Sequence, residues 1–252
     1  MLNPELNFFS FIRLTDPSER AAYNEWHQLD HLPENRALPG VMWGDRWALT
    51  EDCRAVARGE GNLAGADFVA MYWFLPPVEQ AVAEWTQLGE DSFQWGRGPM
   101  LPGIRREMLA FFAPVKGYAA VDAPVSPRVL PLRPHAGVHV EVTHFDDPHA
   151  VETHDAHRRQ DREVIPRLIQ EPGVVGAWTF AFSHPQRHAT LPFPETGDYR
   201  QGSVRIRLTY LDGDPVEGAA RIDAVEASIP GGGAGTTLFS GPLRTIVPWR
   251  DW

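Results

Sequence analysis

The sequence predicts an α+β fold in which one chain carries two tandem ferredoxin-like units, each with the order β-α-β-β-α-β. Two observations lead to this prediction: the same order of strand-like and helix-like segments occurs twice, and short motifs recur at a fixed distance. The Pro-Gly-Val triplet at 39–41, for example, returns 133 residues later at 172–174. A single unit would leave one apolar sheet face in water, so we expect the two sheets to cover each other and enclose a barrel-like core.

The first unit is expected to span residues 1–116. Its opening strand-like run, 8–19, ends in Asp16-Pro17. This pair favours a helix start, because the carboxylate caps free N–H groups and Pro lacks the N–H that a first helical turn leaves unbonded. The predicted segments that follow are a polar helix closing at 31–41, strands at 42–49 and 67–75, a helix at 77–85 and a strand at 106–114.

A proline-rich stretch, 117–134, is interpreted as the linker to a second unit, 135–252. The second unit opens with a strand-like run, 138–150, that also contains Asp-Pro. Its further predicted segments are a helix closing at 164–174, strands at 175–182 and 203–211, a helix at 215–223 and a strand at 243–249. The second half therefore repeats the order of the first.

The composition argues against several classes of function. The chain has 252 residues and a formal net charge of -10, which disfavours nucleic acid as a partner because phosphate binding needs clustered Lys and Arg. No apolar run reaches the roughly 18 residues that span a bilayer, and we expect no membrane partner. The single Cys53 rules out an intramolecular disulfide. With no secretory signal recognised at the N-terminus, a cytoplasmic location is expected.

Two histidines in the first polar helix, His27 and His31, are the main candidates for chemistry. They lie four residues apart, with Asp30 and Glu34 beside them, and residues at this spacing share a helix face. Neither histidine has a counterpart 133 residues later, whereas the nearby proline does, so a purely structural role is less favoured. We predict that His31 is a catalytic base, that His27 is an acid or second proton shuttle, and that Asp30 or Glu34 orients the ring.

Two other interpretations of this histidine pair stay open. It can be a solvent-facing polar stripe, or it can bind a metal ion. A metalloprotease-type pair has Glu directly after the first histidine, where this chain has Gln28, so no metal is predicted.

The strands of the second unit place charged residues on alternate positions. His139 and Glu141 alternate with valines, and Arg205 and Arg207 alternate with apolar residues. If the apolar faces meet the helices, these polar side chains point into the barrel, where Glu141 with an arginine is first of all a structural pair. The predicted substrate-binding residues are Trp26, Trp47 and Tyr72 as walls, with His139, Glu141 and Arg207, the last as an anchor for an oxyanion.

The run from Trp26 to Trp47 resembles the dimeric α/β-barrel superfamily and, within it, the EthD-like proteins. His31, Pro33 and the Leu-Pro-Gly at 38–40 match a helix of that group, in which a histidine precedes a proline shortly before Leu-Pro-Gly. The resemblance implies that the two units form an intrachain pseudo-dimeric α/β barrel. It also implies that the second site has lapsed, because Val164 replaces the histidine there.

Relatives in this superfamily include cofactor-free polyketide cyclases, muconolactone-type isomerases, small monooxygenases without cofactors, and haem proteins of the chlorite dismutase and dye-decolorising groups. Fold alone does not choose among these functions. For haem, His154 or His157 beside Asp155 would have to serve as the ligand, and no motif supports them.

We therefore predict an enzyme of the lyase, isomerase or cyclase type that uses no cofactor and acts on a hydrophobic, aromatic or polyketide-like small molecule. The alternatives are a non-catalytic binding protein for a hydrophobic metabolite, and a haem or cofactor-free oxygenase of the same superfamily. Association into a homo-oligomer beyond the intrachain pair is left open.

Overall fold

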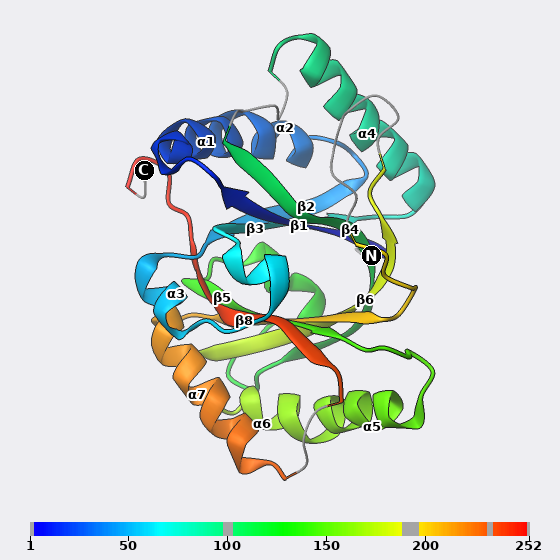
Figure 1. Cartoon of the computed structure of the whole chain (residues 1–252), viewed down its shortest axis with the longest axis vertical. Helices are drawn as coiled ribbons and strands as arrows, with labels where there is room; N and C mark the ends of the chain where they lie inside the picture. Colours follow the sequence, from blue (N-terminus) through cyan, green and yellow to red (C-terminus); the bar gives the residue numbers. More distant parts are fainter. Residues whose placement is uncertain (1–2, 98–102, 188–196, 231–233, 251–252) are drawn as a thin grey trace.

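The computed structural model describes residues 3–97, 103–187, 197–230 and 234–250. Within these ranges, eight strands form one closed barrel in the order β1-β3-β2-β8-β5-β7-β6-β4. Figure 1 shows the two four-stranded sheets face to face, with α1, α2 and α4 outside one sheet and α5, α6 and α7 outside the other. The predicted α+β fold of two tandem ferredoxin-like units is confirmed.

The first half contains every predicted strand and helix. Its strands are β1 (Leu6–Leu14), β2 (Val41–Ala48), β3 (Phe68–Phe74) and β4 (Ile104–Ala119). Its helices are α1 (Arg20–Trp26), α2 (Leu32–Arg36), α3 (Glu51–Val56) and α4 (Val78–Gln94), with short helical turns at Pro17–Glu19, His27–His31 and Gly61–Gly65. Asp16 caps the first turn, since its carboxylate accepts a hydrogen bond from the Ser18 N–H.

The second half repeats this order, and its largest departure from the predicted boundaries is at the start of the last strand. Its strands are β5 (Gly137–His144), β6 (Val174–Pro185), β7 (Val204–Leu211) and β8 (Thr236–Thr245). Its helices are α5 (Val151–Arg159), α6 (Ile165–Leu168) and α7 (Pro215–Ser228), with a turn at Gln160–Val164. The last strand starts seven residues before the predicted 243, because Gly241 and Pro242 look like loop residues in the sequence. Gly241 is needed where the strand passes Ala57, which a Cβ would meet at 2.6 Å.

Two seams close the barrel, and they differ in length. β4 pairs with β6 from Ala110 to Ala119, whereas β2 and β8 share only the pairs Trp47–Thr245 and Ala48–Arg244. β4 thus continues three residues past the predicted end of the first unit at 116. The remaining connection contains a 3-10 helix, Pro127–Leu132, before β5 begins.

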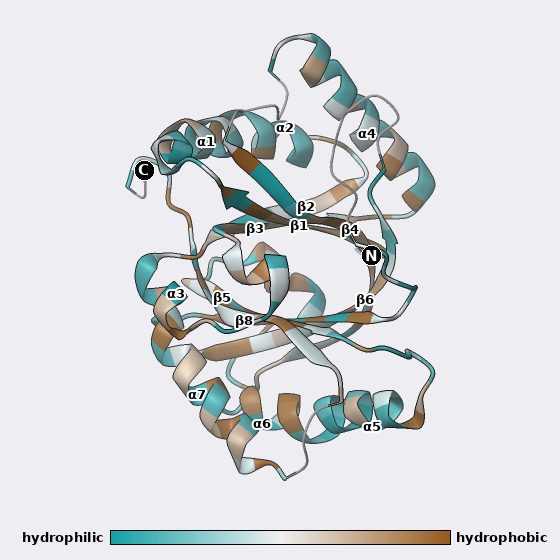
Figure 2. Cartoon of the chain, viewed as in Figure 1, coloured by the Kyte–Doolittle hydropathy of each residue, from teal (hydrophilic) through white to brown (hydrophobic). Residues whose placement is uncertain are grey.

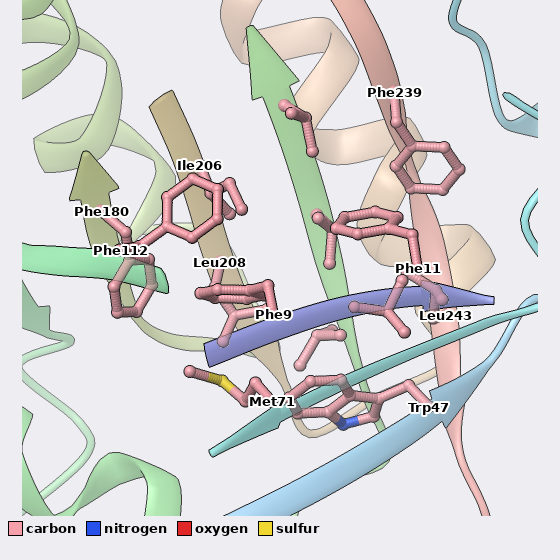
Figure 3. Close-up of a cluster of buried hydrophobic side chains, with 14 of the residues drawn as sticks. Phe9, Phe11, Trp47, Met71, Phe112, Phe180, Ile206, Leu208, Phe239 and Leu243 are labelled. Atoms are coloured by element: carbon pink, nitrogen blue, oxygen red, sulfur yellow. The ribbon is translucent and has the colours of Figure 1, made fainter. Parts of the chain in front are cut away.

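The barrel interior is a packed apolar core. Phe9, Phe11, Trp47 and Met71 of the first sheet meet side chains of the second sheet there (Figure 3). Hydropathy colouring shows the same division, with apolar strands at the centre and hydrophilic outer helix surfaces (Figure 2). The space between the sheets is therefore filled by side chains, and the candidate sites lie elsewhere.

The prediction that polar strand residues of the second half point into the barrel is wrong. Val138, Val140 and Val142 belong to the barrel core, so the alternating His139 and Glu141 face the helices. Arg205 and Arg207 do the same, opposite Ile206. The interior lies between two sheets and is the driest place in the fold, so it takes the apolar face.

Candidate active site

The helix-facing side of the first sheet contains a cavity of about 730 Å³, counting space open to solvent. Its floor is formed by β1, β3 and β4, and its walls by α1, the turn at His27–His31, and α4. The residues that line it are mostly apolar and aromatic, including Phe8, Trp26, Tyr72 and Trp85. A concave, largely apolar pocket with a few polar groups is typical of small-molecule sites.

A π-helical turn at His27–His31 positions both predicted histidines at this cavity. The second half has a π-helical turn at the matching place, Gln160–Val164, 133 residues later. The turn precedes Pro33, which lacks an N–H, and π-helical turns inside α-helices occur frequently at functional sites. The helix thus widens over one turn, which ends at His31 just before Pro33.

His31 is held between an aromatic ring and polar neighbours. Trp26 stacks on its imidazole, with ring centroids 4.7 Å apart and 20° between the planes. The Asn35 Nδ2 atom lies 3.2 Å from His31 Nδ1, and it also donates to the His31 carbonyl at 2.5 Å. Glu34 Oε1 lies 3.9 Å from the same Nδ1. Two neighbours therefore occupy the Nδ1 side of the ring and Trp26 covers its face, which leaves Nε2 as the ring nitrogen available to a ligand.

Of the two predicted acids, Glu34 is the one that approaches His31. Burial raises the pKa of Glu34, but its hydrogen bonds with His31 and Arg97 outweigh this effect and leave the pKa lowered. Glu34 also accepts from the Ser92 hydroxyl at 3.1 Å. Asp30 forms its ion pair with Arg97 on the outer surface of the helix. Glu34 thus presents a carboxylate to the imidazole.

His27 is buried, with 3% of its surface exposed. Burial, with smaller contributions from the positive charge of Arg46 and from His31, holds its pKa well below the usual range. The ring is therefore neutral at pH 7, which does not favour the predicted role of a proton-donating acid. His27 and His31 contact edge to face, with centroids 5.1 Å apart.

Several buried polar atoms at this cavity have no hydrogen-bond partner within the described parts of the chain. They are Nδ1 of His27, the hydroxyl of Tyr72 and Nε1 of Trp85. A buried polar group without a partner costs about 1–3 kcal/mol. Their convergence on one apolar cavity is what a site for a ligand with polar substituents would show.

Two arginines near the cavity were not found from the sequence. Arg106 lines the cavity, and Arg46 lies buried behind Tyr23 and His27. Arg46 donates to the Asn24 side chain at 2.8 Å and lies over the ring of Phe68, and no carboxylate of the described residues forms an ion pair with it. Burial lowers its pKa to about 10, so it stays charged at pH 7. Arg46 lies next to Trp47 in the sequence, at a strand position that faces outward, and this alternation was the signal that could have revealed it.

Four of the predicted substrate-binding residues lie away from this cavity. Trp47 is in the barrel core, where its Nε1 donates to Nε2 of His135 at 2.9 Å. His139, Glu141 and Arg207 face the helices of the second half. Arg207 forms ion pairs with Glu141, at 2.7 Å, and with Glu226, which confirms the structural pair. Arg207 thus lies on the far side of the barrel from His31 and is not its oxyanion anchor.

The resemblance to the dimeric α/β-barrel superfamily left haem binding open, and the residues of the second half do not fit it. Its helix-side cavity is lined by arginines and glutamates, including the Arg207 ion pairs, rather than by a flat apolar slot. His157 lines this cavity, but Asp155 pairs with Arg158 on the exposed surface and does not support it. In the four described ranges, no three His, Cys, Asp or Glu side chains are placed to hold a metal ion.

Comparison with solved structures identifies the architecture. An anthrone oxidase-like protein aligns over 97% of this chain and 92% of its own, with a TM-score of 0.51 and 10% identity. The chain has a dimeric α/β-barrel fold. A candidate monooxygenase from Fusobacterium nucleatum aligns over 97% and 93%, at 0.50 and 10% identity. A dye-decolorizing protein from V. cholerae aligns over 97% and 95%, at 0.50 and 8% identity.

Each of these three alignments runs through both halves of this chain, so the two halves together correspond to one barrel. No protein-family model matches the sequence, and no curated protein matches it either. Of the helices that the structure describes, none has the length and apolar character needed to cross a membrane.

Proposed function

We propose that the cavity of the first half is the active site of an enzyme that removes a proton from a hydrophobic, aromatic small molecule. The observation that carries this proposal is the position of His31. Its ring lies at an apolar, aromatic cavity, stacked on Trp26, with the Glu34 carboxylate on its Nδ1 side. An imidazole next to a carboxylate is suited to taking a proton at neutral pH.

In this proposal Nε2 of His31 takes the substrate proton, and Nδ1 carries the proton that the neutral ring already has. The Asn35 amide stays bound to the His31 carbonyl, and the Glu34 carboxylate, 3.9 Å from Nδ1, stabilises the imidazolium that forms. Neutral His27, with Nδ1 unpartnered, acts as a hydrogen-bonding residue for the substrate rather than as a second proton shuttle.

The substrate anion would be stabilised by arginines. Arg106 at the cavity wall and Arg46 behind Tyr23 place two positive charges at one end of the site. Interactions between charges are stronger in a poorly solvated site than in water. A phenolate or enolate oxygen near Arg106 fits this arrangement, with the aromatic rings among Phe8, Trp26 and Trp85.

The reaction we favour is oxygenation, and the anthrone oxidase-like and monooxygenase neighbours support this choice. An anthrone-type substrate loses a proton from its ring methylene to His31, and the resulting anion reacts with O₂. The methylene loses two hydrogens and gains one oxygen as a carbonyl, and the second oxygen leaves as water. The substrate supplies all the electrons, so the reaction needs no external reductant.

Lyase, isomerase and cyclase reactions, predicted from the sequence, would begin with the same proton abstraction and then proceed without O₂. The experiment is an oxygen-electrode assay of the full chain with anthrone and related polycyclic phenols, with ¹⁸O₂ labelling of the product. We expect O₂ uptake and one labelled oxygen in the product. Product formation without O₂ uptake would instead indicate one of these other reactions.

Variants at two histidines test the base itself. His31→Ala should lower kcat/KM about 10²- to 10⁴-fold, the usual contribution of a general base. His154→Ala, which removes an exposed histidine on α5, is the matched control and should keep full activity. If His31→Ala turns over normally, His31 is not the base. If the unmodified protein and both variants bind the ligands but none of the three converts them, the chain is a binding protein.

A further inference from the structure

The second half contains its own helix-side cavity, of about 900 Å³ with space open to solvent. It lies between the outer face of β5, β7 and β8 and the segment from α5 through the second π-helical turn, with α7 on one side. Gln160 and Val164 line it at the positions that correspond to His27 and His31 in the first half. The cavity is thus the second copy of the site described above, with different side chains.

Positive charge dominates the described lining of this cavity. Arginines at four positions line it, Arg58, Arg159, Arg205 and Arg207, against the two carboxylates Glu141 and Glu226. Both carboxylates bind Arg207, and Arg58 pairs with Asp223 at 2.6 Å, so these charges are already engaged. Arg205 reaches the Asp161 carboxylate only at 3.5 Å.

Arg159 has no carboxylate partner among the described residues. Its guanidinium donates to the Ile229 carbonyl at 3.2 Å, and its Nε has no acceptor. Arg158, the next residue along α5, points to solvent and pairs with Asp155 at 3.0 Å. Two adjacent arginines therefore differ in whether their charge is compensated.

Buried polar atoms without partners mark the same cavity. The side chains of Arg205 and Arg207 are nearly fully buried, with 6% and 2% of each residue exposed, and the Nε atom of each lacks an acceptor. The Ser240 hydroxyl and Nε2 of His157 are also unpartnered and belong to the lining. Burial, followed by the charge of Arg205, lowers the pKa of His157 to about 4, so this ring is neutral at pH 7. Donors outnumber free acceptors, and a ligand rich in acceptor oxygens would satisfy them.

We propose that this cavity binds a small polar molecule through a carboxylate or phosphate group held by Arg159 and Arg205. Its ligand differs in kind from that of the first half, because the lining contains paired charges where the first cavity has aromatic rings. Polar substituents of the ligand reach the Ser240 hydroxyl and the His157 ring. The binding does not depend on the chemistry proposed for His31.

Isothermal titration of the full chain with succinate and, separately, with inorganic phosphate tests this site. We expect one of the two probes to bind at one site per chain, and the probe that binds identifies the oxyanion. Arg159→Gln should weaken that binding at least about tenfold, as expected for losing a charge-assisted hydrogen bond. Arg158→Gln is the matched control and should leave the affinity unchanged.

Thermal unfolding of Arg159→Gln and Arg158→Gln without ligand should be similar, which separates lost binding from lost folding. His31→Ala should bind the probe normally. The proposal is overturned if neither probe binds at millimolar concentration, or if Arg159→Gln and Arg158→Gln weaken binding equally. An equal loss would mean that general surface charge, rather than this cavity, attracts the anion.

Discussion

The first-half cavity and the second-half cavity occupy the same place in two copies of one fold, between the outer face of a sheet and a helix with a π-helical turn. Their linings differ. His27 and His31 face aromatic rings in the first, whereas Gln160 and Val164 face arginines and glutamates in the second. The fold thus repeats the position of a pocket, and the side chains on it determine the chemistry of each copy.

The clearest difference concerns buried arginines. Arg207 in the second half is bound by two carboxylates, Glu141 and Glu226. Arg46 in the first half is equally buried but interacts with an amide and with the faces of Tyr23 and Phe68. A charge with matched partners is part of the structure, whereas the charge of Arg46, which has no counter-ion among the described residues, acts on the neighbouring cavity through the intervening rings.

Removing the arginine of the second half should have the largest effect on stability. Arg207→Met leaves Glu141 without its ion-pair partner and leaves Glu226 with Arg58 alone, at 3.6 Å, and breaking a buried pair in this way costs about 3–5 kcal/mol. Urea unfolding followed by tryptophan fluorescence measures the loss.

The matched variant in the first half is Arg46→Met. Among the described residues it leaves no carboxylate unpaired. The lost hydrogen bond to Asn24 and the lost ring contacts amount to about 1–2 kcal/mol. The comparison fails if the two variants lose the same stability. Arg46→Met should in addition lower turnover, since its charge lies behind the proposed anion site.

Acidification should reveal a buried histidine of the second half. Burial, and then the charge of Arg207, lower the pKa of His139 to about 3. Between that value and the pKa of about 6.5 in the unfolded chain, the unfolded state binds a proton that the folded state does not. His139 therefore has no effect on stability above pH 7 and lowers it as the pH falls. At pH 5 the loss is about 2 kcal/mol relative to pH 7.

The measurement is the free energy of unfolding of the unmodified protein and of His139→Asn at both pH values. The variant should lose about 2 kcal/mol less on going to pH 5. His154→Asn, which removes an exposed histidine, should follow the unmodified protein. If the curve for His139→Asn runs parallel to that of the unmodified protein, His139 is protonated in the folded state as readily as in the unfolded one.

The repeat and the order of its elements were predictable because the signals are local. Asp-Pro helix starts, Pro-Gly stops and strand alternation depend on residues within a few positions of each other. His31, Glu34, Trp26 and Tyr72 were also predicted; His31, Trp26 and Tyr72 line one cavity, and Glu34 lies 3.9 Å from Nδ1 of His31. The first three lie on one helix, and their relative spacing follows from helix geometry.

Which face of each strand enters the barrel was not predictable in the same way. Alternation separates two faces of β5 but does not say which one enters the barrel, because both faces are covered in this fold. Arg106 and Trp85 were missed because they reach the cavity from β4 and α4, far along the chain from His31. Such neighbours depend on which distant segments pair in the fold, and a single sequence does not contain that information.

The smallest effect is expected for Trp47, which the sequence assigned to the cavity wall and the structure places in the barrel core. Trp47→Phe keeps an aromatic ring there and loses the hydrogen bond to His135, which should cost about 0.5–1.5 kcal/mol of stability. Turnover should stay within about twofold, because an intact barrel leaves the outer face of the first sheet unchanged. Trp26→Phe, the matched change at the cavity, replaces the ring that stacks on His31 and should alter KM or kcat instead. If Trp47→Phe impairs turnover more than Trp26→Phe does, the reaction depends on the barrel interior, and the assignment of the active site to the helix side must be abandoned.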